Sequence, residues 1–335
     1  MDNIRVGTAS WTDKSLIDCG RFYPRKTLSA EERLRFYASR FPLVEVDSSY
    51  YAIPSPANAR LWAERTPPGF EFNVKAFRLF TGHQTPPVVL HKDIRQALGP
   101  RVPQVLYYRQ LPPELRDELW RRFHEALAPL QAAGKLVAVH FQFAPWVRNT
   151  REGRAQVAHC VERMGGQLVS VEFRHRSWFE GAQYEATLDF ERSLQVAHTI
   201  VDAPQGFDNS VPPVWAVTDP RLALLRLHGR NAATWNVQGA SAASDRFNYL
   251  YSHEELAGLV PPLREVAALA RRAHVLFNNN MEDQGQVCAR EMRALLDAAQ
   301  AAQAAQAPNP AGAASSAGHP GHADRGAAAA GPGRA

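Results

Sequence analysis

The sequence predicts an α/β protein built as one (β/α)8 barrel, followed by a low-complexity tail. Short apolar runs alternate with amphipathic segments, and this order requires parallel strands joined by helical crossovers. Eight such runs occur within about 280 residues, which is the usual length of this barrel. A doubly wound open sheet is the main rival. That fold usually has fewer strands and often a glycine-rich turn after the first one, whereas here the first strand ends in Gly7-Thr8-Ala9-Ser10-Trp11.

The apolar runs and the helical periodicity set the expected elements. The predicted strands span residues 4–10, 43–51, 70–76, 136–144, 168–174, 198–203, 222–229 and 274–280. The predicted helices span residues 29–40, 56–65, 113–133, 151–164, 252–271 and 283–299, with a weaker one near 185–195. Ser29 with Glu32, and Ser252 with Glu255, have the spacing of capping boxes at helix starts.

Composition narrows the class of protein. The chain has 335 residues, of which 45% are hydrophobic and 21% charged, and a formal net charge of +5. That charge is too small and too dispersed to indicate a nucleic-acid partner by itself. The three cysteines are far apart and form no CxxC motif, so we expect no disulfide framework and a cytoplasmic protein. No apolar run approaches the ~18 residues of a membrane helix, and the chain enters its first strand without a signal-peptide pattern.

The domain organisation follows from a change in composition near residue 300. Residues 1–299 are expected to form the barrel domain. In residues 300–335, 25 of 36 residues are Ala, Gly or Pro and none is a large apolar residue. Such a segment buries too little surface to offset its ordering entropy, so we expect a disordered tail.

Three long loops follow predicted strands. They cover residues 77–112, 204–220 and 230–251, and each carries aromatic residues. Loops after strands of this barrel lie at its carboxyl-terminal face, where active sites are built. We therefore expect residues 77–112 to form a lid or a pocket wall, and residues 230–251 to belong to the same face.

Polar side chains gather near the carboxyl ends of the predicted strands. Strands buried on both faces should be almost continuously aliphatic, and a charge inside one is costly unless it is paired. Period-two alternation places Glu172 with Arg174 on one strand face, and Arg226 with His228 on another. If these faces point inward, six side chains converge at one mouth: Glu45, Lys75, Glu172, Arg174, Arg226 and His228. The alternative is that they form structural ion pairs, such as Glu45–Lys75 or Glu172–Arg226.

The segments at these strand ends resemble a known family. GTASW, VEVDSSYY, FNVKA, FQFAPWV, VEFRHRSW, RLHGRN and FNN are similar to the signature of the domain of unknown function 72 family. The resemblance runs from about residue 4 to residue 298. It implies a TIM-barrel fold and supplies no reaction, because the family is named for its unestablished function.

The residue types favour acid–base chemistry on a polar, anionic substrate such as a sugar phosphate, a nucleotide or a phosphodiester. Arg174, Arg226 and Arg230 would clamp the anion bidentately. Glu172 or His228 would move a proton. Lys75 would stabilise oxyanion charge or form a Schiff base. The remaining candidates are Glu45 for catalysis, and His175, Gln142, Asn278, Trp11 and Asp47 for substrate binding.

Two other functions compete with this hypothesis. In the first, Glu172, Asp202 and His228 bind a divalent metal ion in a phosphoesterase or isomerase. The presence of arginines in the same layer argues against a cation there. In the second, the barrel is a non-catalytic module that binds a nucleotide or nucleic acid. The arginine-rich segment 114–123 also contains Glu and Asp, which is more typical of a solvated helix face.

Overall fold

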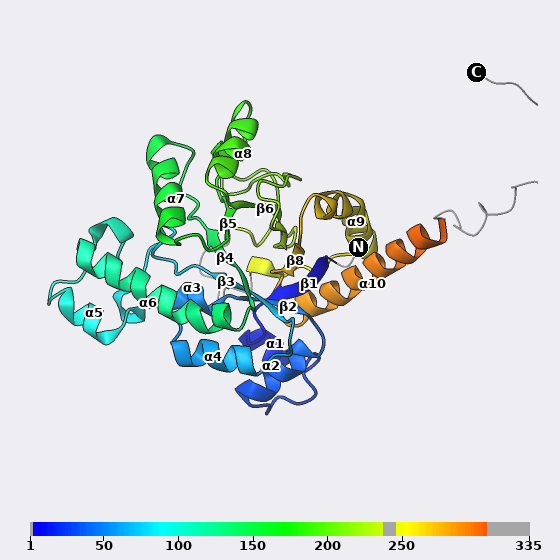
Figure 1. Ribbon diagram of the computed structural model, residues 1–335, viewed down its shortest axis with the longest axis horizontal. Helices are drawn as coiled ribbons and strands as arrows, with labels where there is room; N and C mark the ends of the chain where they lie inside the picture. Colours follow the sequence, from blue (N-terminus) through cyan, green and yellow to red (C-terminus); the bar gives the residue numbers. More distant parts are fainter. Residues whose placement is uncertain (1–2, 237–245, 307–335) are drawn as a thin grey trace, which may run out of the picture.

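The computed structural model, which describes residues 3–236 and 246–306, confirms the predicted (β/α)8 barrel. Eight parallel strands close in sequence order, and the last pairs with the first. The strands are β1 (Ile4–Ala9), β2 (Leu43–Val46), β3 (Glu71–Lys75), β4 (Leu136–Gln142), β5 (Val169–Glu172), β6 (Ala197–Asp202), β7 (Ala223–Leu227) and β8 (Ala273–Phe277). Figure 1 shows the helices arranged around this central barrel.

The helices in the described ranges include all seven predicted ones and three short ones, over residues 14–19, 48–51 and 92–97, that were not predicted. They are α1 (Lys14–Cys19), α2 (Ala30–Ala38), α3 (Ser48–Tyr51), α4 (Pro56–Glu64), α5 (Lys92–Ala97), α6 (Pro113–Ala132), α7 (Arg151–Arg163), α8 (Gln183–Ser193), α9 (His253–Ala268) and α10 (Gln284–Gln306). The capping boxes at Ser29 and Ser252 are both present. None of the helices in the described ranges is long and apolar enough to cross a membrane.

Two predicted boundaries differ most from the structure. The second strand ends at Val46 instead of residue 51, because the chain turns there into the short helix α3. Ser49 therefore leaves the strand face of Glu45, and its hydroxyl lies within hydrogen-bond distance of the carbonyl oxygens of Val46 and Lys75, at 2.8 and 2.6 Å. Helix α10 continues to Gln306, past the expected start of the tail at residue 300. The rest of the predicted tail, residues 307–335, lies outside the described residues.

The interior of the barrel has an apolar floor. Side chains from different strands form one buried cluster, which only inward-pointing residues of a closed barrel can do. The cluster contains Leu43, Ala138, Leu168, Ala197, Leu222, Leu224 and Leu276. Because side chains alternate along a strand, Glu45, His140 and Arg226, two positions after floor residues, also point inward. The polar ends of the strands thus meet above the floor, at the carboxyl-terminal mouth.

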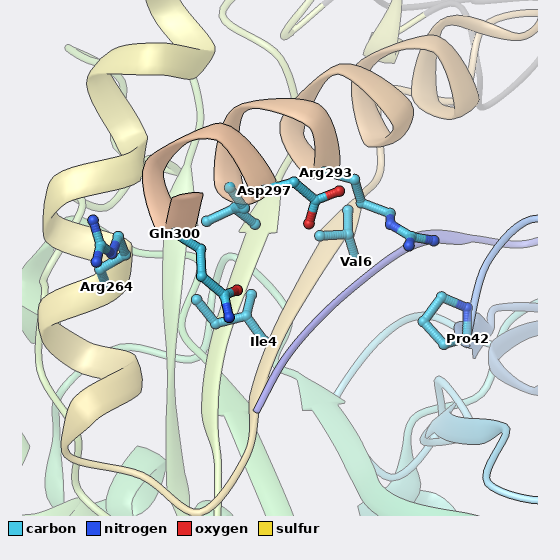
Figure 2. A pocket seen from close by; sticks show the side chains of 8 residues that line it. Ile4, Val6, Pro42, Arg264, Arg293, Asp297 and Gln300 are labelled. Carbon is cyan, nitrogen blue, oxygen red and sulfur yellow. The ribbon is translucent and has the colours of Figure 1, made fainter. Parts of the chain in front are cut away.

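The opposite end of the barrel is closed by an ion cluster. Glu71 at the start of β3 accepts from His274 Nε2 at 2.7 Å and from Arg272 Nε at 3.1 Å. Near the same end, a cavity of about 120 Å³ lies between β1 and α10. Figure 2 shows α10 crossing β1 there, above Ile4 and Val6. This cavity lies outside the strand layer and away from the polar mouth.

Candidate functional site

Glu172, the last residue of β5, is the centre of the polar mouth. Its side chain is fully buried, and Gln142 Nε2 donates to Oε1 at 2.6 Å. His228 Nε2 donates to the same oxygen at 3.0 Å, and Arg226 Nη1 donates to Oε2. Arg226 Nη2 donates to Glu45 Oε1 at 2.6 Å, so one buried guanidinium joins two carboxylates. The structure therefore brings together five predicted site residues.

The charges of this cluster fix its protonation states. Burial alone would raise the pKa of Glu172, but Arg226, His228 and the contact with His140 outweigh it and hold that pKa well below its usual range. Burial lowers the pKa of His228 to about 4. His228 is therefore neutral at pH 7. Its Nδ1 accepts from Asn278 Nδ2 at 2.8 Å, which leaves the proton on Nε2, facing Glu172.

His140 belongs to this buried cluster as well. It points inward from β4 between the floor residue Ala138 and Gln142. Its Nε2 lies 3.4 Å from Glu172 Oε2, and its Nδ1 lies 3.0 Å from Ser170 Oγ. Sequence reasoning assigned His140 no role, although its alternation with Gln142 could have found it.

Three cations lie nearer to solvent. Lys75 Nζ donates to Asp47 Oδ1 at 3.2 Å and lies 4.5 Å from the centre of the Tyr50 ring. The Arg78 guanidinium lies 5.1 Å from the same ring and forms no ion pair with the described part of the chain. Arg174 lies 4.8 Å from the ring of Trp235. We call Lys75, Arg78 and Arg174 the cationic mouth.

The cationic mouth surrounds one histidine. Burial, together with the charges of Lys75, Arg78 and Arg174, lowers the pKa of His83 to about 3. The His83 ring also packs against Tyr50, with ring centres 5.2 Å apart. Three positive charges therefore face the same small region, with the Asp47 carboxylate beside Lys75. Such a concentration of positive charge attracts an anion.

Arg174 has N–H groups that no described residue accepts from. Its Nη1 lies 3.6 Å from Glu172 Oε1, beyond hydrogen-bond distance, and it donates no hydrogen bond to another residue in the described ranges. Its side chain is 12% exposed. A guanidinium stacked on an indole with free N–H groups is arranged to accept a planar anionic group.

Several predicted site residues lie elsewhere. Asp202 accepts from Arg230 Nη2 at 2.7 Å and from the Tyr251 hydroxyl at 2.6 Å. Ala197 faces the barrel interior, so Asp202, five positions later, faces outward. The predicted joint clamp of Arg174, Arg226 and Arg230 therefore does not form.

The structure does not bring together Glu172, Asp202 and His228, the ligand set of the alternative metal-dependent hypothesis. Asp202 is held by Arg230 and Tyr251, whereas Glu172 and His228 contact each other inside the barrel. Within residues 3–236 and 246–306, no three His, Cys, Asp or Glu side chains form a group that could hold a metal ion.

Two further candidates are displaced from the mouth. His175 is out of phase with Glu172 and Arg174, and its Nδ1 accepts from the backbone N–H of Ser177 at 3.1 Å. Trp11 is buried and packs edge-on against Trp62, with ring centres 5.9 Å apart.

Sequence reasoning missed three residues of the mouth. Arg78 follows β3 by three positions and could have been found as a second cation after Lys75. Tyr50 carried no signal, and His83 was expected to be structural or solvated, because their place depends on α3 and on the path of the loop after β3.

The predicted loops line the same face. Residues 77–112 contain α5 and a short antiparallel bridge between Thr85 and Leu106. Gly82 and Tyr107 line a cavity of about 570 Å³ beside α7, so this loop is a pocket wall. Residues 237–245 of the predicted loop 230–251 lie outside the described residues.

Comparisons with known proteins identify the family. Residues 5–313 match the family model described as protein of unknown function DUF72. The UPF0759 protein YunF of Bacillus subtilis (strain 168) is 34% identical over 296 residues, covering 88% of this chain and 95% of that protein.

Solved structures agree with this match. A DUF72 family protein from Enterococcus faecalis V583 has a TM-score of 0.72 at 28% identity, covering 88% of this chain and 95% of that one. A DUF72 family protein from Thermotoga maritima MSB8 has a TM-score of 0.66 at 26% identity, covering 88% of this chain and 99% of that one. The chain belongs to the DUF72 family.

Proposed function

We propose that the carboxyl-terminal mouth of the barrel binds a small anionic substrate and transfers a proton to or from it. The observation that carries this proposal is the cationic mouth, where three positive side chains surround His83 and Tyr50. Arg78 has no ion-pair partner in the described ranges, and Arg174 keeps free N–H groups. These two guanidinium groups bind the phosphate or carboxylate of the substrate.

The inner cluster has a positioning role in this proposal. Glu172 is surrounded by donors from Gln142, His228 and Arg226, and it is fully buried. A carboxylate with so many donors stays ionised and is a weak base. Its charge orients Arg174 from 3.6 Å away. Glu45 and Arg226 anchor this arrangement to the barrel wall.

The proton is carried by the Lys75–Asp47 pair. These side chains are 9% and 16% exposed, in contrast to the fully buried Glu172 and His228. Lys75 has one hydrogen bond, to Asp47, and two further N–H groups that can reach a substrate oxygen. Asp47 accepts a proton from the substrate, and Lys75 stabilises the negative charge that then develops.

A ligand screen tests the proposal. Phosphorylated and carboxylated metabolites are compared with their neutral analogues in thermal-shift assays, because a ligand that binds only the folded state raises Tm. Anions that lack a flat unsaturated ring should raise Tm in the wild type and lose this effect in an Arg78→Met/Arg174→Met double variant. An Arg25→Met/Arg121→Met double variant removes the same charge from exposed surface pairs and should keep it.

Turnover separates catalysis from binding. Each anion that binds is incubated with the wild type and with Asp47→Asn, and its conversion is followed by NMR. Conversion by the wild type but not by Asp47→Asn supports the proposal that the protein is an enzyme. Anion binding without conversion indicates a non-catalytic binding module. If neutral analogues bind as tightly as the anions do, the proposed anion site is contradicted.

A further inference from the structure

A cavity that the mouth does not use lies between residues 77–112 and α7. It has a volume of about 570 Å³, within the range of about 300–1,000 Å³ that is typical of small-molecule sites. It is lined on one side by Gly82, Tyr107 and Arg109, and on the other by Gln156 and His159 of α7.

An anchored tryptophan forms one wall of this cavity. Trp146 is 50% exposed, which is unusual for so large a ring. Its Nε1 donates to the carbonyl oxygen of Gly82 at 2.9 Å, and its ring packs edge-on against His83, with centres 5.9 Å apart. A ring that is exposed yet held in place loses little freedom when a ligand stacks on it.

Positive charge lines the same cavity. Arg109, Arg116 and Arg148 all border it, and none of them forms an ion pair within the described residues. Arg116 lies 5.5 Å from the centre of the Tyr108 ring, and its Nε is buried without a hydrogen-bond partner. Glu152 is the acidic residue in the lining. Arginines held in this way form bidentate pairs with phosphate or carboxylate groups.

The backbone at Gly82 brings the two walls together. Gly82 has φ +85°, and a Cβ there would lie 2.7 Å from Gln156 Nε2 on α7. Only glycine permits this conformation and this approach without strain. The Gln156 amide consequently borders the cavity beside Trp146, where it can donate to or accept from the edge of a flat ring.

We infer that this cavity is a second ligand site, which takes a compound that joins a flat unsaturated ring to an anionic group, such as a nucleoside monophosphate. The ring stacks on Trp146, and the anion pairs with Arg109 and Arg116. The inference does not rest on the proposed function of the mouth. The two sites share the wall made by His83 and Trp146 but use different cations.

Calorimetric titration with adenosine monophosphate tests this site. Because each lost charge-assisted hydrogen bond costs about 1.5–3 kcal/mol, Arg109→Met and Arg116→Met should each raise Kd by about tenfold or more. Trp146→Ala should also raise Kd. Leu269→Ala removes another exposed apolar side chain, on a different surface, and should leave Kd unchanged.

Two comparisons make the outcome decisive. Adenosine, which lacks the anion, and ribose 5-phosphate, which lacks the ring, should both bind much more weakly than the monophosphate. The Arg78→Met/Arg174→Met variant of the mouth should bind the monophosphate as the wild type does. The inference would be overturned if the wild type did not bind the monophosphate, or if all three cavity variants bound it as tightly as the wild type does. Loss of binding only in the mouth variant would also overturn it.

Discussion

Arg226 Nη2 lies 2.6 Å from Glu45 Oε1, and both side chains are fully enclosed by the barrel. The same guanidinium also pairs with Glu172, so a strand on each side of the interior is tied to β7 through one cation. A buried charge of this kind is tolerated only because its partners are present. The pairing therefore explains how a polar layer can lie inside the barrel, directly above an apolar floor.

Replacing the shared cation tests its role in stability. Arg226→Met leaves two buried carboxylates without their partner, so we expect the free energy of unfolding to fall by about 3–5 kcal/mol. Arg221→Met breaks the pair with Asp219 at a side chain that is 43% exposed, and should cost less than about 1 kcal/mol. Urea denaturation measures both. Similar losses in the two variants would contradict the assigned role.

The pH dependence of stability follows from His228. Its folded pKa of about 4 is below the ordinary value of 6.5, so the unfolded chain binds its proton first as pH falls. The stability that depends on neutral His228 is fully present above about pH 6.5 and is lost as pH falls toward 4. His228→Gln should therefore reduce the slope of unfolding free energy against pH in this window.

Glycine positions test the closure of the barrel. A Cβ at Gly7 in β1 would lie 2.1 Å from the carbonyl oxygen of Leu43, so Gly7→Ala must push β1 away from β2. Gly258 lies inside α9 with no atom near its Cβ position, so Gly258→Ala should stabilise by about 0.5–1 kcal/mol. We expect Tm to fall in the first variant and rise in the second. A neutral Gly7→Ala would contradict the described register.

The Lys75–Asp47 pair makes a prediction about rate. Once a substrate of the mouth is known, Asp47→Asn should lower kcat by about 10²–10⁴-fold while changing KM little, because general-base catalysis contributes that much. Lys75→Arg should restore part of the activity lost in Lys75→Met, since it keeps the positive charge beside Asp47. Steady-state kinetics and circular dichroism of each variant provide the check. Unchanged kcat in Asp47→Asn would remove this residue from the reaction.

The alternation of apolar and polar residues predicted most of the fold and the inner cluster. It places Glu45, Glu172, Arg226 and His228 inward, because each follows a floor position by an even number of residues along its strand. The prediction succeeds where a strand continues up to the site and where the side chain contacts another residue that points into the barrel.

The same rule fails where the strand ends or the phase changes. Ser49 follows the turn into α3, so period two no longer applies to it. Asp202 and His175 are out of phase with the inward positions and are bound by other partners. Arg78 and His83 are placed by the loop after β3, whose path depends on tertiary packing that no local pattern records.

Equilibrium dialysis with radiolabelled inorganic phosphate tests the central claim most directly. We expect one saturable site in the wild type that survives in Arg109→Met and is lost in the Arg78→Met/Arg174→Met double variant. Binding that is equal in the wild type and this double variant, or no saturable binding to the wild type, would contradict an anion site at the mouth of the barrel.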